Sequence, residues 1–155
     1  MKKFTIISLI ITLLICSVLC FPVGAVEVAN NTETTITYLE NGDYIETTIT
    51  CYETNARAAT KSGSKTSNYK NSDGETLWSV TVNGTFTYNG TTSSCTSVSR
   101  SASSSNSSWT IKSTSCTKSG NCASATAIAT YKAFLTSYDK TVTVNLYCSP
   151  YGILS

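Results

Sequence analysis

The chain has 155 residues, of which only 13% are charged, and it carries a formal net charge of +2 and no histidine. The lack of histidine excludes catalytic sites built on a histidine base, and it excludes zinc bound by histidine. Basic residues are scattered singly, without the patch that binds nucleic acid. We therefore expect a protein that is not an enzyme, needs no cofactor or metal, and binds no nucleic acid.

The N-terminal residues have the pattern of an export signal. Two lysines precede an apolar run from Phe4 to Leu19, and the small residues Val23 and Ala25 follow. This pattern predicts a signal peptide over residues 1–25 with cleavage after Ala25. The apolar run is shorter than the ~20 residues that span a bilayer, so we expect no membrane anchor after cleavage. The predicted location is secreted and extracellular.

An acidic hairpin is predicted next. Strand-forming residues from Thr34 to Tyr52 flank Asn41-Gly42, and Asn-Gly is the strongest short hairpin signal. Residues 26–59 contain six acidic residues and one basic residue, a balance of −5, whereas residues 60–155 have a balance of +5. Opposite charges on two parts of a chain suggest either pairing between them or a removable acidic leader.

The segment after the hairpin is predicted to be a linker. Glu53–Ser64 lacks periodicity and is rich in small residues. Such a stretch is accessible to proteases, and a second cut is expected near Arg57 and Ala59. Residues 26–59 are thus a hairpin and linker that either belong to the working protein or form a pro-segment.

The remaining residues, 60–155, have the pattern of an antiparallel β domain. Ser99–Ser108 is rich in serine and is predicted to be a loop, and Ser137–Lys140 is predicted to be a turn. Strands are predicted at Thr66–Lys70, Thr76–Tyr88, a segment ending near Val98, Trp109–Ser113, Asn121–Leu135 and Val142–Cys148. We therefore predict an all-β fold with a single antiparallel β-sandwich, for which an immunoglobulin-like arrangement stays open.

The strand predicted at Asn121–Leu135 is unusual in composition. Alanines recur at every second position from Ala123, and they alternate with serine, threonine and isoleucine. This period of two favours a strand over a helix, although alanine-rich runs are often helical. A face of small residues would let another layer approach closely.

Five cysteines remain once the signal peptide is removed, and an odd number cannot pair completely within one chain. They are Cys51, Cys95, Cys116, Cys122 and Cys148. Cys116 and Cys122 flank a turn-rich stretch and could close a small loop. Cys95 and Cys148 are the second candidate pair, which would leave Cys51 free or intermolecular. Alternatively, all five stay reduced and act as small buried hydrophobes.

Aromatic residues with polar tips are the candidate binding groups. Exposed rings of this kind can stack on sugars beside hydroxyl and amide partners. Trp78 and Trp109 fit the core better, whereas Tyr138 and Tyr147 are weaker core candidates and are our predicted binding residues. The expected partner is a cell envelope or a polysaccharide surface.

Several segments together resemble a known group of sequences. They are Tyr38–Tyr44, Ala58–Thr66, Leu77–Val80, Gly84–Gly90, Trp109–Ile111, Cys148-Ser149 and Leu154-Ser155. On these segments the chain resembles an uncharacterised family of small secreted proteins from Gram-positive, gut-type anaerobic bacteria. The resemblance implies bacterial export and a β fold, and it brings no catalytic residues. Cys116 and Cys122 depart from the family pattern.

Two functional hypotheses follow. The first is a secreted, non-enzymatic β-sandwich that binds a cell surface or a glycan outside the cell. The second is an antimicrobial or toxin-like pro-protein that is activated when the acidic leader is removed. The sequence leaves the oligomeric state open.

Overall fold

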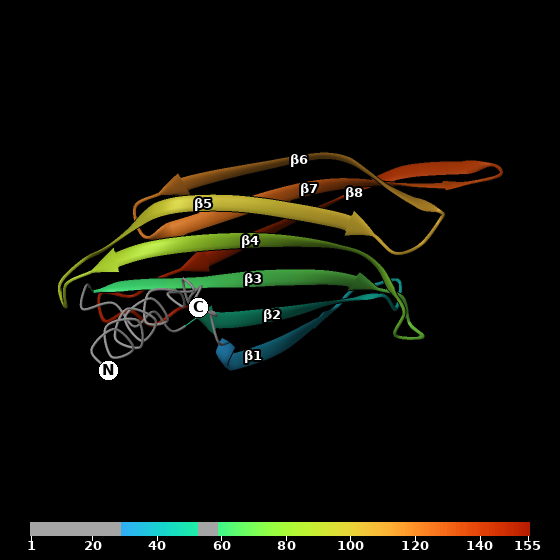
Figure 1. The fold of residues 1–155 in the computed structure, drawn as a ribbon. Coiled ribbons are helices and arrows are strands. Elements are labelled where there is room, and N and C mark those ends of the chain that lie inside the picture. The colour runs from blue at the N-terminus through green and yellow to red at the C-terminus, as the bar shows by residue number, and fades with distance from the viewer. Residues whose placement is uncertain (1–28, 53–58) are drawn as a thin grey trace, which may run out of the picture.

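A computed structural model describes residues 29–52 and 59–155 of the chain (Figure 1). In this part the fold is all-β, without a helix, and two antiparallel sheets pack as a sandwich, which confirms the predicted fold class. The strands are β1 (Ala29–Tyr38), β2 (Tyr44–Tyr52), β3 (Thr60–Lys70), β4 (Thr76–Tyr88), β5 (Ser93–Ser104), β6 (Trp109–Ser119), β7 (Cys122–Ala133) and β8 (Thr136–Tyr147).

Both sheets are meanders in which each strand pairs with the next one in the chain. The first sheet has the order β1-β2-β3-β4-β5 and the second has the order β6-β7-β8. The chain passes from one sheet to the other between β5 and β6, and hydrogen bonds connect β5 to the start of β6 and to the turn just after it. The Ser104 hydroxyl donates to the Trp109 carbonyl (2.9 Å), and the Cys95 N–H donates to the Gly120 carbonyl (2.8 Å).

Alternation of apolar and polar residues places the core between the sheets. On β4 the buried side chains include Trp78, Val80 and Val82, and the intervening residues face outward. On β7 the four alanines from Ala123 to Ala129 are fully buried in the same alternation, as the period-two pattern predicted. Cα atoms of β4 and β7 come within 8 Å of one another. This is closer than the ~10 Å usual between packed sheets, because alanine offers only a methyl group.

The predicted N-terminal hairpin is confirmed, and it belongs to the larger sheet. Tyr38 pairs with Tyr44 at its turn, where Gly42 has a φ of 86° that favours glycine. β2 then pairs with β3 along its whole length. β2 is half-buried throughout, while the described side chains of β1 are exposed. The described part of the hairpin therefore forms one edge of the five-stranded sheet and is not a separate unit.

The predicted linker is wrong in its second half, because β3 already begins at Thr60. Gly63 pairs with Gly84 of β4, and the inner side of Gly63 is covered by Leu154. The buried Ser64 hydroxyl shares a hydrogen bond with the Tyr52 hydroxyl (3.1 Å). Small residues here permit close packing within a strand rather than marking a flexible connection.

Two further sequence predictions are wrong. The serine-rich segment from Ser99 is strand as far as Ser104, because Ser99, Ser101 and Ser103 place their hydroxyl groups on the outer face beside the polar residues of β4. The segment Ser137–Lys140 lies within β8, and the turn occurs at Phe134-Leu135 instead. The many serines of Ser99–Ser108 had suggested a loop. The period-two alternation that runs through Leu135 had suggested that the strand continues to that residue.

Neither predicted disulfide is present, since all five described cysteines are free. Cys116 lies opposite Ala125 on the inner face of its sheet, whereas Cys122 alternates with the buried Ala123 and faces outward. Side chains on opposite faces cannot meet in a disulfide. Cys95 and Cys148 are both buried, and burial raises the pKa of each thiol. The structure thus agrees with the reduced alternative.

The two predicted cleavage positions lie mostly outside the described residues. The signal peptide, Ala25 and Arg57 fall in the ranges 1–28 and 53–58. Ala59 is described and exposed, and its carbonyl accepts a hydrogen bond from the Tyr88 N–H (2.9 Å). Within the described ranges, no helix has the length and apolar character needed to cross a membrane.

Candidate functional site

A cleft of about 650 Å³ lies between the β1–β2 turn and the beginning of β8. Two segments that are far apart in the sequence form its walls. It is lined by Tyr38, Leu39, Glu40, Asn41, Tyr138, Asp139 and Lys140. The lining thus contains tyrosine, carboxylate, amide and ammonium residues, but not all of their side chains point inward. The Tyr38 ring lies 5.8 Å from Tyr44 on the outer face of the larger sheet. The Asp139 carboxylate is turned towards Lys112 and Thr130 on the outer face of the smaller sheet.

The turn side of the cleft is held by hydrogen bonds to one carboxylate. Asp43 Oδ2 accepts from Asn41 Nδ2 and from the Tyr69 hydroxyl, each at 2.7 Å. Tyr69 is buried, so this contact ties the turn to the core. Burial, together with the bond to Asp43, raises the pKa of Tyr69 far above its usual value. The hydroxyl therefore stays protonated and keeps donating to the turn.

The other wall is positioned by a chain of aromatic rings. The Tyr138 ring lies 5.8 Å from Trp109 in an edge-to-face arrangement and 5.1 Å from Tyr131. Trp109 in turn contacts Tyr69 and Trp78. Such ring pairs stabilise one geometry beyond the area they bury. Burial, and then the nearby Asp43 charge, raises the pKa of Tyr138. The ring thus enters the cleft in a fixed orientation with its hydroxyl protonated.

Asp139 is held as an anion at the edge of the cleft. Its Oδ2 lies 2.6 Å from Lys112 Nζ, and its Oδ1 accepts from the Thr130 hydroxyl at 2.6 Å. These two bonds, with Lys112 the larger cause, lower the pKa of Asp139. Both of its oxygens therefore already accept hydrogen bonds from neighbouring side chains.

Tyr147, the second predicted binding residue, lies far from this cleft. It is separated from Tyr138 by nine residues along β8, or about 30 Å at the usual rise. It also faces outward, and it pairs with Cys122, whose hydrogen bond raises the pKa of Tyr147. The two tyrosines therefore cannot share a site. Tyr38, Glu40 and Asn41, which also line the cleft, were not predicted from the sequence, where the only signal at these positions was the hairpin turn itself.

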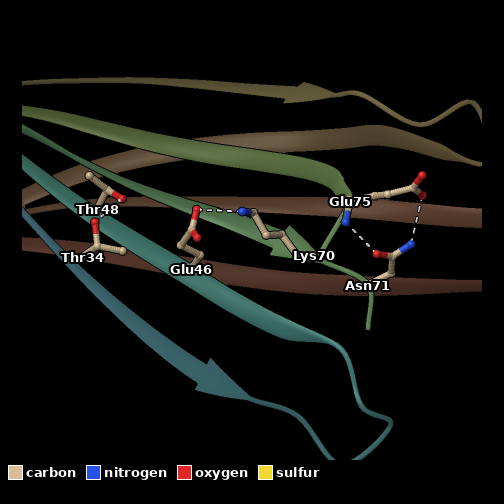
Figure 2. Close-up of polar contacts among 6 residues, drawn as sticks. All are labelled: Thr34, Glu46, Thr48, Lys70, Asn71 and Glu75. Carbon is tan, nitrogen blue, oxygen red and sulfur yellow. Dashed lines mark hydrogen bonds and ion pairs between the residues drawn. The ribbon is translucent and has the colours of Figure 1, made fainter. Parts of the chain in front are cut away.

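A second surface is the outer face of the five-stranded sheet, where hydroxyl groups lie in rows across the strands. Figure 2 shows one such pair, Thr34 with Thr48 (3.1 Å), beside an ion pair between Glu46 and Lys70 (3.0 Å). Charges on this face are few and are paired. A shallow depression of about 280 Å³ is lined there by Tyr52, Ser62, Gly63, Asn83, Gly84, Thr85, Ser97 and Ser99.

Metal ligation finds no support in the described part of the chain. No three side chains among its cysteines, aspartates and glutamates are grouped closely enough to hold an ion.

Comparison with known proteins gives no relative. No protein-family model matches the chain, and no curated protein or solved structure is significantly similar to it.

Proposed function

We propose that this protein is a secreted, non-enzymatic β-sandwich protein that binds a glycan of a cell surface or extracellular polysaccharide. The observation that carries the proposal is the cleft whose lining includes Tyr38, Glu40 and Asn41 from one segment and Tyr138 and Asp139 from another. Sugars present apolar C–H faces and a rim of hydroxyl groups. Tyrosine rings suit the first, while carboxylate and amide groups suit the second.

Weak, reversible binding fits this geometry better than tight enclosure. The cleft is open to solvent, and Tyr138 is already held by Trp109 and Tyr131. A pre-oriented ring limits the entropy lost when a ligand stacks on it. The hydroxyl rows of the outer sheet face could offer further hydrogen bonds to the same polymer, beside the rings of Tyr38, Tyr44 and Tyr52 on that face.

The test is binding of the mature protein to a panel of bacterial envelope polysaccharides, with Tyr38→Ala as the site variant. Tyr38 is 76% exposed, so its removal should leave the fold intact while weakening glycan binding about tenfold. The matched control is Tyr151→Ala, because Tyr151 is 75% exposed and lies beyond the far end of β8. Affinity electrophoresis or calorimetry would measure both.

Equal binding by the two variants would place any glycan site elsewhere. Absence of binding to every polysaccharide and to whole cell walls would refute the proposal itself. Tyr138→Phe separates the two contributions of that residue, because it keeps the stacking ring and removes only the hydroxyl.

A further inference from the structure

The tip of the β7–β8 hairpin exposes two large apolar side chains. Phe134 and Leu135 are 98% and 90% exposed, more than any other large apolar residue in the described chain. In Figure 1 this hairpin extends past the neighbouring strands at the right of the view. Single exposed apolar residues are ordinary on protein surfaces, but two adjacent ones at a projecting tip are not explained by the fold.

The residues behind the tip form layers in the strand register. Ala133 pairs with Thr136, then Lys132 pairs with Ser137, and then Tyr131 pairs with Tyr138. At about 3.3 Å per residue, the tyrosine pair lies roughly 10 Å behind the apolar tip. An apolar end is thus followed by a cation and then by two rings with polar hydroxyl groups.

Along the hairpin, the charge nearest the tip is positive, and the acidic Glu40 and Asp43 of the β1–β2 turn lie further back, near Tyr138. Lys132 is exposed and is the nearest charged residue to the tip. The nearest carboxylate on the hairpin is Asp139, which is already paired with Lys112 at 2.6 Å. No carboxylate on the hairpin is therefore left to repel a negatively charged surface.

We propose that the Phe134-Leu135 tip inserts into the interfacial region of an anionic lipid bilayer. Apolar groups that enter such a surface reach about 5–10 Å deep, where tyrosine and lysine side chains favour the headgroup level. The layering of the hairpin matches this profile, with Lys132 able to extend towards the headgroups. This inference rests on the hairpin and does not depend on the glycan cleft.

The small size of the tip favours a bilayer over a protein partner. A stable protein–protein interface buries at least about 1,000 Å² in total, and two side chains on a convex tip supply only a fraction of this. A bilayer needs no complementary surface and accepts a convex apolar tip directly. Binding through so few groups should be reversible and should weaken with salt, because part of it is electrostatic.

The experiment is co-sedimentation of the mature protein with vesicles of phosphatidylglycerol, compared with vesicles of phosphatidylcholine. The proposal predicts binding that is stronger on the anionic vesicles and is reduced by added salt. Phe134→Ser with Leu135→Ser should weaken it at least about tenfold. Lys132→Gln should weaken it about fivefold on anionic vesicles only. The control is Tyr151→Ser with Ile153→Ser, which removes two exposed apolar residues from the C-terminal turn.

Absence of binding to both vesicle types would overturn the proposal. So would equal losses in the tip variant and in the C-terminal control, because the effect would then follow general surface apolarity. As a second readout, Phe134→Trp should shift its fluorescence to shorter wavelength when phosphatidylglycerol vesicles are added, and no shift would contradict insertion. Glycan binding should be unchanged in the tip variant, which keeps the two proposals separable.

Discussion

The two ends of the sandwich fill the space between their sheets in opposite ways. At the cleft end, the rings of Tyr69, Trp78 and Trp109 stack and tilt against one another. At the other end, Gly63 and Gly84 lie opposite each other and leave no room for a side chain. Large rings leave irregular margins where a cleft of about 650 Å³ opens, whereas the glycine end has only the smaller depression of about 280 Å³ on its outer face. The comparison teaches that the size of the surface hollow at each end follows from the residues that fill the core there.

The largest effect is expected at the ring end. Trp78 is fully buried, and its Nε1 is the one buried side-chain nitrogen or oxygen in the described residues without a hydrogen-bond partner. Trp78→Ala should lower the free energy of unfolding by about 3–5 kcal/mol, because a large cavity would remain. Urea denaturation followed by circular dichroism would measure it.

Trp78→Phe provides the finer comparison at the same position. It removes the unpartnered N–H, whose burial alone costs about 1–3 kcal/mol, and it keeps a ring for the stack. The loss should therefore be much smaller than for alanine. Equal losses in the two variants would mean that the ring stack contributes little.

A smaller effect is expected at the glycine end. A Cβ atom at Gly63 would lie 2.8 Å from the Thr50 carbonyl oxygen and would also meet Leu154 Cδ1. The backbone oxygen cannot move aside easily, so Gly63→Ala should cost about 1–3 kcal/mol through overpacking. Thermal and urea unfolding would show it, with Ser62→Ala on the outer face as control. If Gly63→Ala and the wild type have the same free energy of unfolding, the space beside Gly63 accepts a methyl group without overpacking.

The smallest effect concerns pH at the cleft. The folded pKa of Asp139 is lowered, chiefly by Lys112, so this pair stabilises the fold above the unfolded carboxyl pKa of about 3.9. The contribution should be lost as the pH falls through the lower folded value. Carbon NMR titration of the carboxyl group would follow it. Lys112→Met should move the pKa of Asp139 back towards its usual value, and an unchanged titration would contradict this assignment.

Much of the fold could be predicted from local patterns. Asn41-Gly42 indicated the first turn, and the alternation of alanine with threonine and serine indicated β7. The errors arose where composition misled. Hydroxyl-rich residues up to Ser104 belong to β5 because one face of that strand needs no apolar side chains. Phe134-Leu135 forms a turn, although the period-two alternation of β7 continues in the sequence through Leu135.

The candidate site was predictable only in part. Tyr138 was identified as a candidate because it fitted the core less well than the tryptophans, and it does line the cleft. Its partner wall comes from the β1–β2 turn, and no local pattern shows that this turn lies against the start of β8. The same limit explains the unformed disulfide, since the spacing of Cys116 and Cys122 does not reveal that they face opposite sides.

The meander topology also constrains the order in which the protein can fold. Every strand pairs only with its neighbours in the chain, so each hairpin closes over a short loop at low entropic cost. During synthesis, which starts at the N-terminus, the chain can complete the sheet from β1 to β5 before β6 has been made. The second sheet then adds as a unit, and its alanine face meets a surface that is already formed. Folding by sequential addition would keep unpaired strand edges few at each stage, which limits aggregation of the incomplete chain.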